Sequence, residues 1–92
     1  MPYDWDPGKA EANFEKHGVN FDAVEGFDWP RALVRADTRI DYGEVRLTAL
    51  ARIGDRIHHL TFTVERRAVR VISLRPASRK EVLRYATETA AH

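Results

Sequence analysis

Histidine, arginine and glutamate side chains alternate with apolar ones along three segments in the second half of the chain. In a β-strand successive side chains point to opposite faces, so Arg46, His59, Glu65 and Arg75 are predicted to share one face of a sheet. Such a face could cleave RNA through the RNA's own 2′-hydroxyl, because that reaction needs a base, an acid and cations that stabilise the charged phosphorane. Glu65 or His59 could act as the base and His59 as the acid. Arg46 and Arg75 are predicted to clamp the phosphate.

Charge is distributed unevenly along the sequence. The formal net charge of the chain is +1. Positions 1–44 carry five more acidic than basic residues, whereas positions 45–92 carry six more basic than acidic residues. Nine of the ten bases in the second half are arginine, whose planar guanidinium group can donate two parallel hydrogen bonds to a phosphate. This pattern favours a polyanionic partner, although charges spread over a solvated surface would give the same composition. The RNA-binding positions predicted from it are Arg66, Arg70, Lys80 and Arg84.

The first third of the chain is acidic and is predicted to be helical. Asp6 can cap a helix that starts at Pro7, and Gly18 can take the left-handed conformation that ends it. His17 precedes this glycine, so we interpret it as a structural residue whose partial charge stabilises the helix C-terminus. A short helical turn follows over residues 21–27. The positions of the first helix that are expected to pack on a sheet are Ala10, Phe14 and His17.

Four strands in an antiparallel meander are predicted for the middle and end of the chain. Their ranges are 32–36, 44–53, 56–65 and 69–75. Apolar and polar residues alternate through the second strand, with Leu50 as the exception, as expected for a strand with one buried face. Gly54 and Asp55 form one tight turn and residues 66–68 form the next. The polar face is expected to carry Arg46, Thr48, His59, Thr61, Thr63, Glu65, Ser73 and Arg75.

A C-terminal helix is predicted to start after Ser78, because Ser78, Arg79, Lys80 and Glu81 fit the S-x-x-E capping box. Arg79 and Lys80 would lie in its first turn, where the helix dipole disfavours cations and an arriving anion would relieve that cost. The order of elements indicates an α+β fold in which residues 1–92 form one domain. The N-terminal helices and the C-terminal helix are expected to pack on one face of the four-stranded antiparallel sheet and to leave the other face polar.

Composition disfavours several classes of protein. The chain has no cysteine, which removes disulfides, thiol catalysis and cysteine zinc sites. No metal-binding motif is found, so no metal or other cofactor is expected. No apolar run approaches the roughly 20 residues that span a bilayer, and the first residues lack the pattern of a secretory signal. We therefore expect a protein of the cytoplasm that has no membrane partner.

Three segments carry a resemblance to a known family. They are W-D-x-x-K-A-x-x-N-x-x-K-H-G-V-x-F at 5–21, DYGEVR at 41–46 and I-S-x-R-x-A-x-x-x-E at 72–81. Together they resemble the BrnT toxin family, which consists of small ribonucleases of type II toxin-antitoxin modules with a RelE-like fold. The resemblance covers nearly the whole chain. One departure is Val82, which stands where many members of the family have arginine after the final glutamate.

The resemblance implies an activity and a set of partners. It implies RNA cleavage that halts translation, and inhibition by a BrnA antitoxin in a toxin-antitoxin hetero-oligomer. That antitoxin would supply a ribbon-helix-helix domain that binds the operator of the operon shared by the two proteins. This chain would therefore contact DNA only through its partner. RelE-like enzymes tend to depend on arginine and lysine charge, which gives weight to Arg46, Arg75 and Arg79 over His59.

Two other functions fit parts of the sequence. A binding module without catalysis could use the same basic face to hold a partner protein or nucleic acid. Direct DNA binding by this chain alone is disfavoured, because no helix-turn-helix pattern is visible and the C-terminal helix is mixed in charge.

Overall fold

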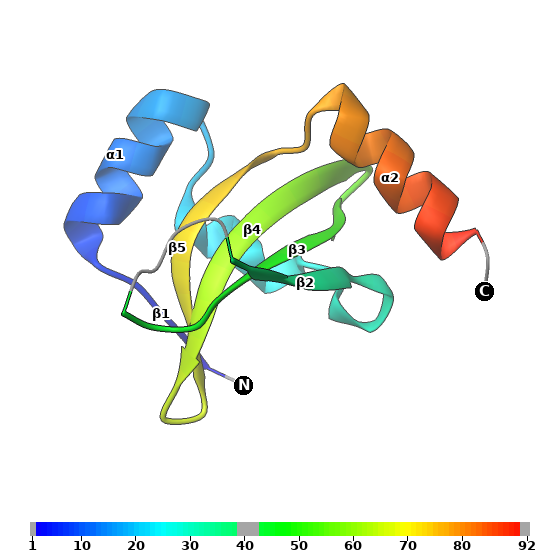
Figure 1. The fold of residues 1–92 in the computed structure, drawn as a ribbon. Helices are drawn as coiled ribbons and strands as arrows, with labels where there is room; N and C mark the ends of the chain where they lie inside the picture. Colours follow the sequence, from blue (N-terminus) through cyan, green and yellow to red (C-terminus); the bar gives the residue numbers. More distant parts are fainter. Residues whose placement is uncertain (1, 39–42, 91–92) are drawn as a thin grey trace.

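The computed structural model describes residues 2–38 and 43–90, so Asp41 and Tyr42 of the DYGEVR segment lie outside the described residues. The predicted helices and the four predicted strands are confirmed, with boundaries that differ by one or two residues, and the short helical turn is a 3₁₀ helix. The elements follow one another in this order (Figure 1): β1 Tyr3–Asp4, α1 Pro7–His17, the 3₁₀ helices η1 Phe21–Gly26 and η2 Trp29–Arg31, β2 Leu33–Asp37, β3 Arg46–Ile53, β4 Arg56–Glu65, β5 Ala68–Pro76 and α2 Arg79–Thr89.

The sheet has five strands in the order β1-β5-β4-β3-β2 and is mixed. The four predicted strands pair antiparallel, and β1 adds a parallel pairing to β5 through Tyr3 with Val69 and Asp4 with Arg70. The α+β class is therefore confirmed, but the expected four-stranded antiparallel sheet of the RelE-like description is corrected. Periodicity could not reveal β1, because two residues are too few to show an alternation. The strand forms because the outer edge of β5 offers unpaired backbone groups: the Val69 N–H donates to the Pro2 carbonyl at 2.9 Å.

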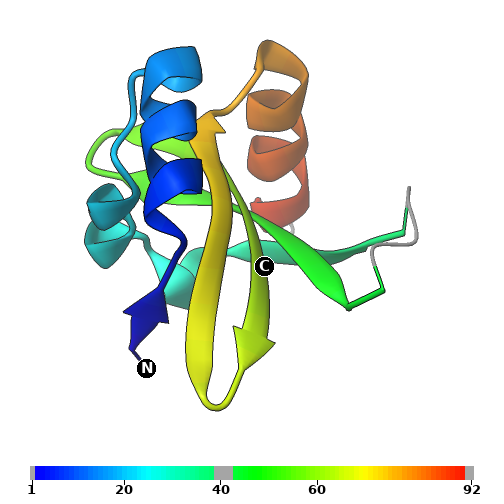
Figure 2. The same cartoon turned by 90° about the vertical axis from the view of Figure 1, so that its left-hand side faces the viewer.

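Helices cover both faces of the sheet, not one face as predicted. The main core lies between η1 and one face of the sheet (Figure 2). Against the opposite face, Tyr85 of α2 packs on Leu50 and Ile57. This explains why Leu50 interrupts the alternation of its strand, since α2 covers that end of the polar face. The main core contains Phe21, Val24, Ala51, Leu60 and Leu74.

The helix α1 packs along the outer edge of β5, and its buried residue is Asn13. The Asn13 amide donates to the Leu74 carbonyl at 2.8 Å and to the Val19 carbonyl at 3.0 Å, and its oxygen accepts from the Leu74 N–H at 3.1 Å. One side chain therefore satisfies the backbone of an edge strand and fixes the position of the helix. Phe14 was predicted to pack on the sheet, but it is 49% exposed because the neighbouring Asn13 takes the inward position.

The helix ends follow the predicted signals with one exception. Gly18 takes the left-handed conformation, with φ of 70°, directly after α1. Asp6 stands at the N-cap position of α1, but its side chain makes no capping hydrogen bond. At the start of α2 the capping box is complete: Ser78 Oγ accepts from the Glu81 N–H, and the Glu81 carboxylate accepts from the Ser78 N–H. The box fixes Glu81 close to the end of β5.

Candidate active site

Two adjacent rows of side chains form the polar floor of a pocket on the face of the sheet that α2 partly covers. In one row His59 of β4 and Arg75 of β5 are direct neighbours, so their Cβ atoms are about 5 Å apart, as paired residues are in any antiparallel sheet. The prediction that these side chains share one face is confirmed. The other row consists of three hydroxyl side chains, one from each of β3, β4 and β5: Thr48, Thr61 and Ser73.

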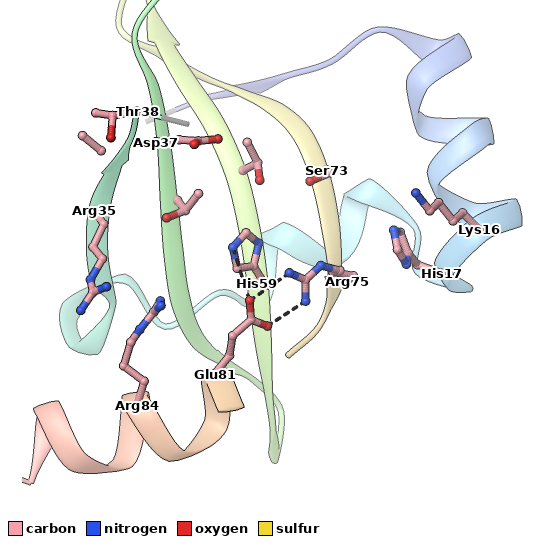
Figure 3. Close-up of a pocket in the computed structure, with 13 residues that line it drawn as sticks. Lys16, His17, Arg35, Asp37, Thr38, His59, Ser73, Arg75, Glu81 and Arg84 are labelled. Carbon is pink, nitrogen blue, oxygen red and sulfur yellow. Dashed lines mark hydrogen bonds and ion pairs between the residues drawn. The ribbon is translucent and has the colours of Figure 1, made fainter. Parts of the chain in front are cut away.

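Three further elements build the walls of this pocket, whose volume is about 520 Å³ (Figure 3). The walls come from the last turn of α1, from β2 and the residue after it, and from the first turns of α2. With the histidines neutral, four bases and two acids line the pocket, which gives a net charge of +2. The pocket therefore favours an anionic ligand. The wall residues are Lys16, His17, Arg35, Ala36, Asp37, Thr38, Glu81 and Arg84.

A two-point ion pair between Arg75 and Glu81 lies at the centre of the pocket (Figure 3). Arg75 Nη1 donates to Glu81 Oε1 at 2.8 Å and Nη2 donates to Oε2 at 2.9 Å. Hydrogen bonding from Arg75, together with the Ser78 N–H and the nearby His59, lowers the pKa of the Glu81 carboxyl to about 2, although burial acts in the opposite direction. Glu81 is therefore ionised at neutral pH and holds the guanidinium in one orientation. His59 Nε2 lies 3.8 Å from the same carboxylate.

His17 lines the pocket on the side of Arg75 away from His59 (Figure 3). Burial lowers the pKa of the His17 imidazole, and the positive charges of Lys16 and Arg75 lower it further. The imidazole is therefore predominantly neutral at pH 7 and able to accept a proton. The structural role that the sequence indicates for His17 stays a prediction, and in the structure the end of α1 also reaches the pocket.

Arg35 and Arg84 form the wall opposite His17 and share one acidic partner. Arg35 Nη2 donates to both Glu88 carboxylate oxygens at 3.0 and 3.1 Å, and Arg84 Nε lies 3.7 Å from Glu88. One carboxylate thus serves two guanidinium groups, so positive charge remains on this wall. Arg84 was predicted to bind RNA and does line the pocket, whereas Arg35 was not singled out from the sequence.

Three predicted site residues lie at the other end of the β4–β5 hairpin. Glu65 ends β4 and pairs with Ala68 next to the turn, so the proposed role of Glu65 as the base beside His59 is corrected. Arg66 occupies the turn itself with a φ of 48°. Arg70 Nη1 donates to the Asp4 carboxylate at 3.2 Å. Glu65, Arg66 and Arg70 line a separate hollow there, because the six residues from His59 to Glu65 span about 20 Å along an extended strand.

Arg46, Arg79 and Lys80 also lie outside the residues that line the pocket. Arg46 is at the start of β3, where its Nε lies 3.3 Å from Glu44. Arg79 and Lys80 are exposed on the first turn of α2. Fewer of the predicted residues therefore share the pocket than strand alternation indicated. The prediction that Arg46 lies beside Arg75 in one phosphate clamp is corrected.

The composition of the pocket decides which chemistry it can support. Among residues 2–38 and 43–90, no group of three or more histidine, aspartate or glutamate side chains is arranged to hold a metal ion. The pocket instead combines two imidazoles that can transfer protons with cations and hydroxyls that can bind phosphate. These are the groups needed for acid-base chemistry at a phosphodiester. Within the same described ranges, no helix has the length and apolar character needed to cross a membrane.

Comparisons with known proteins found a matching family and a similar solved structure. Residues 5–81 match the model of a family described as ribonuclease toxin, BrnT, of type II toxin-antitoxin system. The crystal structure of the Brucella abortus ribonuclease toxin, BrnT, is similar to 86% of this chain and to 100% of the solved chain, with 33% sequence identity and a TM-score of 0.65. A comparison with curated proteins gave no significant match. The family match includes His17, His59, Arg75 and Glu81 and ends before Arg84.

Proposed function

The chain belongs to the BrnT family of ribonuclease toxins of type II toxin-antitoxin systems, and from this premise we propose that the pocket cleaves RNA without a metal ion. The observation that carries the proposal is the convergence of two imidazoles, four basic side chains and four hydroxyls on one cavity. An RNA phosphodiester has the charge that this cavity favours. Its 2′-hydroxyl supplies the nucleophile, so the protein has only to move protons and stabilise charge.

Arg75 is the residue best placed to stabilise the transition state. The phosphorane formed by attack of the 2′-oxygen carries more negative charge than the starting phosphodiester, so a fixed cation stabilises it more than it stabilises the substrate. Glu81 holds the Arg75 guanidinium by two hydrogen bonds, which reduces the reorganisation needed when charge develops. Lys16 and Arg84 add positive charge on the two sides of the pocket.

Family membership implies an antitoxin for this chain and RNA as its target. We propose that the antitoxin is of the BrnA type, that its ribbon-helix-helix domain binds the operator DNA, and that the two proteins form a hetero-oligomer. The free toxin would cleave messenger RNA in the cytoplasm and thereby stop translation. The sequence resemblance over residues 5–21 and 72–81 supports this assignment.

Induction of the protein without its antitoxin tests this function in cells. We expect growth to stop and messenger RNA to be cut, and Arg75→Ala to restore both at equal protein levels. Arg56→Ala is the matched control, since it removes an exposed arginine of β4 that lies outside the pocket. Normal growth with intact RNA at good expression would remove the proposal. RNA binding without any cleaved product would instead favour a non-catalytic binding module.

A further inference from the structure

We propose that His17 and His59 form the proton-transfer pair of this reaction, with His17 as the general base and His59 as the general acid. The proposal rests on the proposed function, because it assigns roles within the same pocket. The two imidazoles come from different elements, α1 and β4, and Arg75 lies between them (Figure 3). A phosphate bound to Arg75 would therefore have one imidazole on each side.

Displacement at phosphorus requires groups on opposite sides of the phosphate. The attacking oxygen and the leaving oxygen lie roughly in line through the phosphorus atom. A base beside the 2′-oxygen and an acid beside the 5′-oxygen must therefore face each other across the phosphate. His17 and His59 line the pocket on opposite sides of Arg75, whereas Glu65 lies toward the far end of the hairpin and His58 points into the opposite face of the sheet, where it is buried.

The surroundings of the two histidines assign the roles. His17 has a lowered pKa, caused first by burial and then by Lys16 and Arg75, so it is neutral and ready to accept a proton. Glu81 Oε2 lies 3.8 Å from His59 Nε2, so a protonated His59 would have a negative partner, whereas the charged groups that act on His17 are both positive. Contrasting surroundings of this kind distinguish an acid from a base. The remaining charged groups of the pocket are Arg35 and Asp37 on β2 and Arg84 on α2.

The proposed step balances without any further reactant. His17 takes the proton of the 2′-hydroxyl while the 2′-oxygen forms its bond to phosphorus. The bond from phosphorus to the 5′-oxygen breaks with its electron pair on oxygen, and His59 gives its proton to that oxygen. The products are a 2′,3′-cyclic phosphate and a 5′-hydroxyl end. His17 is then protonated and His59 neutral, and exchange of protons with water restores both.

Substrates with a sulfur leaving group separate the two roles. A 5′-bridging sulfur leaves as a thiolate, which needs no proton, so an oligonucleotide with this single change at the mapped cleavage site bypasses the general acid. On the ordinary RNA we expect His17→Ala and His59→Ala each to lower kcat/KM by ~10²–10⁴-fold. On the sulfur substrate we expect His59→Ala to recover to within about tenfold of the wild type, because only its task has been removed. His17→Ala should remain slow on both substrates.

Three outcomes would overturn the assignment. Near-normal cleavage of ordinary RNA by His17→Ala would show that His17 is not the base. Recovery of His17→Ala, but not of His59→Ala, on the sulfur substrate would show that the roles are reversed. Equal loss on both substrates for His59→Ala would show a structural role for His59. Failure of the wild-type protein to cleave either substrate would be different, because it would contradict the proposed function and not the pairing of the histidines alone.

Controls keep loss of folding apart from loss of proton transfer. Each variant is compared with the wild type by circular dichroism and by urea unfolding before kinetics. His17→Gln, which keeps a planar polar side chain but cannot titrate, replaces His17→Ala if the alanine variant is unfolded, with the same results expected. Arg56→Ala serves as the kinetic control, since it removes an exposed basic residue of β4 that lies outside the pocket.

Discussion

At the scale of single residues, Glu81 connects the pocket to the start of α2. It accepts two hydrogen bonds from Arg75, accepts the Ser78 N–H at 2.8 Å and faces His59 at 3.8 Å. Charge-assisted hydrogen bonds of this kind are roughly twice as strong as neutral ones. A single carboxylate therefore orients Arg75, caps a helix and lies beside a histidine.

Glu81→Gln is predicted to make the free energy of unfolding less dependent on pH in the acid range. The folded-state pKa of Glu81 is lowered from 4.5 to about 2, so its contribution is fully present above pH 4.5 and is lost as pH falls toward 2. At pH 7 we expect the variant to be less stable by about 1–3 kcal/mol in urea unfolding. The difference should shrink as pH falls through this window. A difference that stayed constant down to pH 2 would contradict the account, and Glu25→Gln on η1 controls for loss of one exposed negative charge.

The pH dependence of cleavage is predicted to report on His17. A general base must be deprotonated to act, so kcat/KM should rise with pH as His17 loses its proton and then level off. Because burial, Lys16 and Arg75 lower the pKa of His17 below its ordinary 6.5, the midpoint of this rise should lie below pH 6.5. The rise should disappear in His17→Gln. Persistence of the same rise in that variant would assign the base to another group.

The sequence identified the floor of the pocket better than its walls. Strand alternation was enough to place His59 and Arg75 on one face. It could also have found Arg35, which is paired with Thr48 across β2 and β3. His17 could not be found in this way, because its place in the pocket depends on how α1 packs against the edge of β5. Tertiary packing of that kind leaves no periodic signal in the sequence.

At the scale of elements, the position of α1 depends on a hydrogen-bonded asparagine more than on apolar contact. Asn13 is the buried residue of this helix and bonds to both backbone groups of Leu74. The same helix turn carries Lys16 and His17 into the pocket. The edge of β5 and the pocket are thus connected through one side chain.

Asn13→Ala is predicted to reduce both stability and activity. It leaves the buried N–H and C=O of Leu74 without their partner, which should lower the free energy of unfolding by about 2–4 kcal/mol. Cleavage should fall further than the folded fraction accounts for, because His17 is no longer fixed. Asn20→Ala is the matched control, since the exposed Asn20 side chain makes no capping bond to η1. Equal unfolding curves for Asn13→Ala and Asn20→Ala would refute the role of Asn13.

The turn between β4 and β5 is strained, because arginine occupies two positions that favour asparagine and glycine. Arg66 and Arg67 have φ of 48° and 65°, and two-residue hairpin turns with positive φ at both positions favour asparagine and glycine. We predict that the double change Arg66→Asn and Arg67→Gly raises the free energy of unfolding by about 1–2 kcal/mol. Thermal unfolding should show a higher midpoint. An unchanged or lower midpoint would mean that the turn is not strained, and a simultaneous loss of RNA affinity would support the sequence prediction that Arg66 binds RNA.

At the scale of the whole molecule, the sequence predicted the order of elements and the α+β class. It did not predict how the basic residues are distributed between the pocket and the far end of the hairpin. The excess of arginine in the second half indicated one continuous basic face. In the structure, Arg75 and Arg84 line the pocket, whereas Arg66 and Arg70 lie at the far end of the hairpin. Charge counts along a chain cannot show this separation, because it depends on the length and direction of β4 and β5.

Cleavage of purified RNA in the presence of EDTA tests the central claim most directly, namely that the pocket around Arg75 is a metal-independent ribonuclease site. The account predicts cut RNA with 2′,3′-cyclic phosphate and 5′-hydroxyl ends, a loss of ~10²-fold or more for a folded Arg75→Ala variant, and an unchanged rate for Arg56→Ala. Absence of cleavage until a divalent metal is added, or an Arg75→Ala variant as active as the wild type, would contradict it.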